Sequence, residues 1–138
     1  MWTFNGKPFD TPPDGAYGFV YKITRVSDGK AYIGRKQFET HRRAAKRKTT
    51  RKRPVVVKPS NWLLYRSSCE ELQAAICRLG VAAFKFEVLT VCYSKAALSY
   101  QETRHMFLCD VLFAKLPNGE RAYWNGNING KWFPSKVA

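Results

Sequence analysis

Four residues near the start of the chain could build a site for polar chemistry: Tyr21, Tyr32, Gly34 and Lys36. Two phenols and a cation can orient a water molecule or bind a phosphate, and a glycine beside them leaves room for a ligand. The same residues also occur in ordinary strands, where tyrosines simply pack across the sheet. The elements that carry these residues therefore decide whether they form a site.

A β-hairpin would place them on one face. Two runs of alternating residues flank Asp28-Gly29, which is a strong signal for a hairpin turn. If the loop has two residues, Tyr21 pairs with Lys36 and Arg25 pairs with Tyr32. Paired residues point to the same side of a sheet, so the two tyrosines and Lys36 would meet. A loop longer by one residue would turn one strand over and separate them.

The rest of the chain predicts a single α+β domain. Residues 68–80 have the pattern of a helix, with Ser68 as N-cap in a capping box with Glu71. We expect a strand at 84–91 and a second helix at about 95–115 that Ser94 caps.

The domain boundaries follow from composition. An irregular arm at 1–15, rich in proline and glycine, precedes a domain at 16–138 that contains a basic insert at 37–60. Within the insert, Val55-Val56-Val57 is either a short strand or a packed loop. The expected architecture is a small mixed or antiparallel sheet, made of the hairpin and a third strand, that is flanked by helices.

The charge points to a polyanionic partner. The chain of 138 residues has 24 Lys and Arg against 10 Asp and Glu, a net charge of +14. Eight of the twelve residues from Arg42 to Arg53 are basic. Such an excess opposes compact folding and is typical of proteins that bind nucleic acid. Phosphate contacts of this kind position a protein on DNA without reading the sequence.

Other classes are disfavoured by what the sequence lacks. The four cysteines form no C-x-x-C pair, so zinc is not expected, and they are typical of reduced thiols in a cytoplasm. We find no signal peptide, no membrane span and no amphipathic basic helix. Two distant histidines also disfavour an HNH-type nuclease.

The hairpin motifs resemble the two signatures of GIY-YIG nucleases. Phe19-Val20-Tyr21 is a degenerate form of the first signature, and Tyr32-Ile33-Gly34 is an intact second one, ten residues later. Further likeness to small phage endonucleases of the Seg type covers roughly residues 2–130 and includes Trp62, Tyr65, Ser67-Ser68 and Tyr123-Trp124-Asn125-Gly126.

The resemblance implies a divalent metal, Mg²⁺ or Mn²⁺, held by a glutamate on a helix after the hairpin. Two acids on the second helix, Glu102 and Asp110, have mostly apolar neighbours at helical spacing, and that argument does not choose between them. The family pattern selects Glu102. It also makes Asn125 a late residue that supports the site.

The resemblance further implies a catalytic cation shortly after the second signature. The usual family spacing points to Arg42, and Arg35, Arg43 and Lys36 remain as alternatives. Tyr21 is the candidate general base, and Tyr32 would orient water or phosphate. We expect DNA phosphates to be bound by the remaining cations around the insert, which are Arg35, Arg43, Lys46, Arg47, Lys48, Arg51, Lys52 and Arg53.

The expected function is therefore a metal-dependent DNA endonuclease of the phage homing or host-DNA-attacking kind, acting on double-stranded DNA in the cytoplasm of the host. No small-molecule cofactor or membrane is expected, and monomer and homodimer both stay open. The alternative is a non-catalytic basic module that binds DNA or RNA and keeps the same scaffold. A third class is a basic protein that binds another protein. It would show no affinity for DNA that falls steeply with salt concentration.

Overall fold

The computed structural model describes residues 1–43 and 55–137; for residues 41–43 it describes the backbone only. A five-stranded sheet has the order β2-β1-β7-β3-β4. Its strands are β1 (Trp2–Phe4), β2 (Lys7–Pro8), β3 (Gly18–Arg25), β4 (Ala31–Gln37) and β7 (Phe84–Cys92). β1 runs parallel to β7, and the other pairs are antiparallel, so the sheet is mixed.

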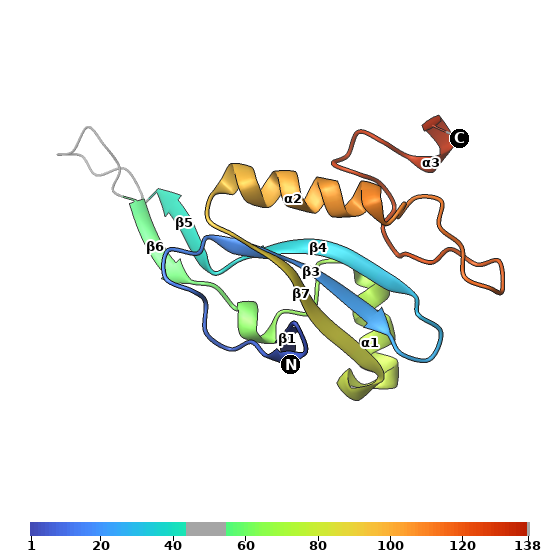
Figure 1. Cartoon of the computed structure of the whole chain (residues 1–138), viewed down its shortest axis with the longest axis horizontal. Helices are drawn as coiled ribbons and strands as arrows, with labels where there is room; N and C mark the ends of the chain where they lie inside the picture. Colours follow the sequence, from blue (N-terminus) through green and yellow to red (C-terminus); the bar gives the residue numbers. More distant parts are fainter. Residues whose placement is uncertain (44–54, 138) are drawn as a thin grey trace.

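A second, two-stranded sheet follows β4. It consists of β5 (Glu39–Arg43) and β6 (Val55–Pro59), which pair antiparallel and stand at one end of the molecule in Figure 1. The run Val55-Val56-Val57 thus belongs to a strand. Lys46, Arg47, Lys48, Arg51, Lys52 and Arg53, which we predict to bind DNA, lie outside the described residues.

Helices cover both faces of the large sheet. The long helices are α1 (Glu70–Leu79) and α2 (Lys95–Leu108), and the short ones are η1 (Trp62–Leu64), η2 (Val81–Ala83) and α3 (Pro134–Val137). Figure 1 shows α2 along one face and α1 on the other. Among the described residues, no helix is both long enough and apolar enough to cross a bilayer.

Alternation along β3 supplies a core on each face. Phe19, Tyr21 and Ile23 belong to one buried cluster together with Leu72 and Ile76 of α1. Val20 belongs to a second buried cluster, which includes Ile33 of β4 and Leu98 and Met106 of α2. Because successive strand residues point to opposite faces, β3 is buried on both sides, which explains its nearly continuous apolar sequence.

Both expected helices form, and the second ends earlier than predicted. Gly80 ends α1 at φ 88°, and Ser94 caps α2 by accepting a hydrogen bond from the Ala97 amide at 3.0 Å. The second helix ends at Leu108 and not near residue 115. Asp110 takes a positive φ of 52°, a conformation that stops an α-helix.

The N-terminal segment is not an irregular arm throughout. Trp2 is 2% exposed and packs in the α1-side core, and its indole Nε1 donates to the Trp62 carbonyl at 2.8 Å. The strand around it has three residues and pairs with β7, more than 80 positions away. A strand this short has no periodicity to detect, so the sequence pattern could not predict it.

The hairpin register also differs from the prediction. The loop has four residues, Val26 to Gly29, and it is closed by a hydrogen bond from the Arg25 amide to the Lys30 carbonyl at 2.8 Å. Asp28 stabilises this loop, because its carboxylate binds the Arg25 side chain at 2.6 Å and accepts from the Lys30 amide at 3.1 Å.

The predicted strand pairs are therefore wrong, but the predicted face is right. Tyr21 pairs with Gly34 and not with Lys36, and Tyr32 pairs with Ile23 and not with Arg25. The register moves by two residues, which is one full β repeat. Because side chains alternate with a period of two, the two tyrosines and Lys36 keep a common side.

Candidate active site

A cavity of about 710 Å³ opens at the outer edge of β4, the last strand of the sheet. It lies where that edge meets α2, the start of α1 and the segment after residue 124. Its lining combines hydroxyl, amide and charged groups: Tyr21, Tyr32, Gly34, Arg35, Ser68, Ser99, Glu102, Met106, Asn125, Gly126, Asn127 and Asn129. Six residues that the sequence analysis singled out are thus brought together: Tyr21, Tyr32, Gly34, Arg35, Glu102 and Asn125.

The two phenols converge beside Gly34. The rings of Tyr21 and Tyr32 have their centroids 6.3 Å apart. A Cβ atom at position 34 would lie 2.6 Å from Cζ of Tyr21 and 3.0 Å from Cε1 of Tyr32. Glycine is therefore required at this position by the space that the Tyr21 hydroxyl occupies. A register shift in the pairing of β3 with β7 falls at Val20/Tyr21, and such bulges often adjust a side chain next to a site.

Burial keeps both phenols protonated when neither metal ion nor substrate is bound. Tyr21 is 1% exposed, and its pKa is raised well above 10, chiefly because burial disfavours the phenolate. Proximity to Tyr65 raises it further, whereas a hydrogen bond with Ser67 acts in the opposite direction. Tyr32 is only partly buried, and its pKa is also raised by burial, while a hydrogen bond with Ser68 lowers it.

The two serines before α1 therefore bind the phenols, and the predicted capping box is wrong. The N-cap of α1 is Cys69, with no side-chain hydrogen bond, and the helix begins at Glu70. Ser67 Oγ accepts from the Cys69 amide at 3.0 Å, and its backbone carbonyl accepts from Gln73 Nε2. With Ser68 turned toward Tyr32, no side chain caps the helix.

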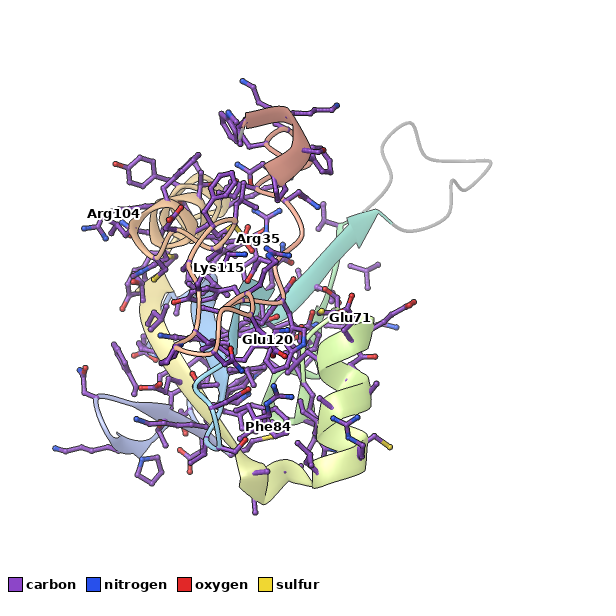
Figure 2. The ribbon with its side chains drawn as sticks, turned by 90° about the vertical axis from the view of Figure 1, so that its right-hand side faces the viewer. Arg35, Glu71, Phe84, Arg104, Lys115 and Glu120 are labelled. Atoms are coloured by element: carbon purple, nitrogen blue, oxygen red, sulfur yellow. The ribbon has the colours of Figure 1, made fainter. Side chains whose placement is uncertain are left out.

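Glu102 enters the cavity from α2 and meets Arg35 of β4. Arg35 Nε lies 3.7 Å from Glu102 Oε1, and the carboxylate side chain is 13% exposed against 46% for the arginine. Burial raises the pKa of Glu102, and the arginine partly offsets this shift. In Figure 2, Arg35 and Arg104 lie on different sides of α2.

These donors fit one hard divalent cation and no larger cluster. Among the described residues, no group of three or more His, Cys, Asp or Glu side chains could hold a metal. Mg²⁺ commonly uses one or two carboxylates and fills its remaining positions with water and phosphate oxygens. The single desolvated carboxylate of Glu102, in a polar cavity of this size, matches that requirement.

Asn125 acts on the backbone of β4. It is 3% exposed; its Oδ1 accepts from the Ile33 amide at 3.1 Å, and its Nδ2 donates to the Ile33 carbonyl at 2.8 Å. The preceding segment pairs with the same edge, through hydrogen bonds from the Ala31 amide to Ala122 and from the Trp124 amide to Ala31. The Asn125 side chain thus extends the row of hydrogen bonds along the outer edge of β4. The next residue of the strand, Gly34, lines the cavity.

The other predicted cations have different positions. Lys36 does not line the cavity; its Nζ lies 4.3 Å from the ring centroid of Tyr65, and burial lowers its pKa. Arg42 and Arg43 lie in β5, where they pair with Val56 and Val55. Arg35, an alternative in the sequence prediction, is the arginine that lines the cavity.

Sequence reasoning missed three contributors. Ser68 looked like the N-cap of the helix, and Ser67 entered only as part of the family likeness. Their adjacency just after Tyr65 was the available signal. Arg121 was not considered; its guanidinium donates to the carbonyls of Val111 and Asn125 and holds the segment that carries Asn125. Nothing in the local sequence distinguishes this arginine from the many other cations.

One comparison identifies the family of the chain. A family model described as "Putative endonuclease segE, GIY-YIG domain" matches residues 2–128. The α+β fold with its five-stranded mixed sheet is consistent with a domain of the GIY-YIG class. The chain belongs to this segE GIY-YIG family. Searches of the curated proteins and of the solved structures found no match.

Proposed function

We propose that the chain is a divalent-metal-dependent DNA endonuclease that hydrolyses a phosphodiester bond by in-line attack of water. One observation carries the proposal: Glu102, Arg35 and the two phenols, which come from three elements, line a single polar cavity. Membership of the GIY-YIG family supports nuclease chemistry. The net charge of +14 supports a nucleic-acid substrate, double-stranded DNA.

Glu102 would hold one Mg²⁺ or Mn²⁺ ion, which would supply Lewis-acid stabilisation of the charge that develops on the phosphate. Arg35 is exposed enough to bind a non-bridging phosphate oxygen while its Nε stays near Glu102. Arg42 remains a prediction for a second phosphate contact. Asn125 would keep the backbone of Tyr32-Ile33-Gly34 in place by its two bonds to Ile33.

One phenol would accept the proton of the attacking water, and the other would orient that water. An unperturbed phenol needs roughly 4 kcal/mol to reach a pKa of 7, and burial adds to this cost. The sequence pointed to Tyr21 as the base. The greater exposure of Tyr32 supports the reverse assignment, with Tyr32 as base and Tyr21 as the orienting residue.

A nicking assay on supercoiled DNA with Mg²⁺ tests the proposal. We expect wild type to cleave and Glu102→Gln to lose about 100-fold or more of the rate, because the metal-binding carboxylate is removed. Glu120→Gln, at an exposed carboxylate away from this cavity, should keep full activity. The Glu102→Gln protein should unfold no more easily than wild type, since a buried carboxylate becomes a neutral amide.

Equal cleavage by wild type and Glu102→Gln would contradict the mechanism. A wild-type protein that binds DNA with a steep salt dependence but never cleaves it would be the non-catalytic module. We further propose a phage homing or host-DNA-attacking type that works in the host cytoplasm, supported by the segE family and by four free thiols. Mapping the products on a long duplex would test this through the frequency and position of the cuts.

A further inference from the structure

Ser67 has a backbone conformation that a serine rarely adopts. Its φ is 83°, in the region that favours glycine, and it is 2% exposed. A non-glycine residue in such a conformation is strained, and the strain persists where the surroundings require the side chain. Glycine would adopt this conformation with less strain, so we expect the serine hydroxyl to have a role of its own.

The groups around the Ser67 hydroxyl indicate this role. Ser67 Oγ accepts from the Cys69 amide, which leaves its own O–H free to donate. That hydroxyl meets the hydroxyl of Tyr21, and the next residue, Ser68, meets the hydroxyl of Tyr32. Consecutive serines thus contact one catalytic-site phenol each. Ser68 itself lines the cavity, whereas Ser67 is buried behind it.

We propose that Ser67 and Ser68 are a pair of positioning residues that hold Tyr21 and Tyr32, one serine to each phenol, in the orientation that the reaction needs. This inference rests on the proposed nuclease function. A serine O–H that donates to the phenol oxygen fixes the direction of the phenol and favours its ionised form. α1 begins at Glu70 without a side-chain cap hydrogen bond, so neither serine serves as the cap of this helix.

A spectroscopic experiment tests the pairing without any activity. The full-length chain is labelled with 3-fluorotyrosine, and the ¹⁹F resonances of two of its seven tyrosines are assigned with Tyr21→Phe and Tyr32→Phe. We expect Ser67→Gly to move the Tyr21 resonance alone and Ser68→Ala to move the Tyr32 resonance alone. Ser99→Ala, which removes a hydroxyl that lines the same cavity from α2, should move neither.

Kinetics test what the pairing does. Ser67→Gly relieves the strained φ and should fold as stably as wild type. Its kcat should fall about tenfold or more while KM stays within about twofold, because the phenol is present but not oriented. A residue with only a structural role would allow glycine at full kcat.

The outcomes separate this inference from the proposed function. Cleavage by wild type together with full kcat in Ser67→Gly and Ser68→Ala would overturn the inference and leave the nuclease intact. Fluorine shifts that spread to both tyrosines in each variant, or that are missing in both, would also overturn it. A wild-type protein that does not cleave would refute the proposed function, even if the fluorine spectra showed the one-to-one pairing.

Discussion

At the scale of single residues, the site depends on how closely side chains approach. Gly34 is the clearest case, since the phenol of Tyr21 occupies the space where a Cβ atom would be. Tyr21 itself cannot move freely, because it is buried and contacts Ser67 and Tyr65. A small change at position 34 should therefore disturb stability and chemistry together.

We expect Gly34→Ala to lower the free energy of unfolding by roughly 1–3 kcal/mol, as overpacking does in a close-packed core. The cleavage rate should fall as well, since Tyr21 must shift. Gly126→Ala is the matched control. Gly126 lines the same cavity, but an added Cβ would meet nothing within 4 Å. Urea unfolding of both variants gives the comparison, and equal stability of the two would show that the close approach is not rigid.

At the scale of elements, the β3–β4 hairpin sets the positions of both phenols. Its loop is held by Asp28, which binds Arg25 and the Lys30 amide. The hydrogen bond with Arg25 is the main cause that lowers the pKa of Asp28 to about 2. A carboxyl whose pKa is lower in the folded state stabilises the fold above its unfolded pKa of about 3.9. That stabilisation is lost as the pH falls from about 4 to about 2.

Asp28→Asn should therefore destabilise the protein at pH 7 by at most about 1 kcal/mol, since the pair is close to the surface. Asparagine keeps an oxygen for the Lys30 amide and removes only the charge. The difference between the two proteins should shrink below pH 4 and vanish near pH 2 in urea unfolding measured across that range. A difference that stays constant with pH would show that the ion pair does not stabilise the turn.

At the scale of the whole molecule, the charge is unevenly distributed along the chain. Six of its Lys and Arg residues lie between positions 46 and 53, in the stretch of sequence that joins β5 to β6. The β5–β6 sheet stands at one end of the molecule in Figure 1. If six to eight cations of this region contact phosphates, log K should fall with log salt at a slope of about −5 to −7.

Replacing these six cations with glutamine should bring the slope about 5 closer to zero, because each phosphate contact contributes roughly 0.9. Binding measured at several salt concentrations gives the slope. The control replaces six exposed cations that do not line the site cavity: Lys7, Arg78, Lys85, Lys95, Arg104 and Lys136. Equal slopes for the two variants would mean that total charge, and not the region at 46–53, governs DNA affinity.

Local patterns in the sequence determined the elements that carry the site. Alternation predicted β3, β4 and β7, and a serine and a glycine at helix ends predicted the start of α2 and the end of α1. Placing Tyr21 and Tyr32 on one side of the sheet needed nothing beyond these patterns. The prediction survived a wrong register because the side-chain repeat and the register error are both two residues.

The tertiary structure alone decided which distant groups meet. Arg35 lies near Glu102, Asn125 binds Ile33, and the two serines before α1 bind the phenols instead of capping the helix. These contacts join segments on different strands and helices, so their partners depend on the order of strands in the sheet and on which face each helix covers. Periodicity acts over a few residues, and it therefore specifies the direction of a side chain but not the partner that it reaches.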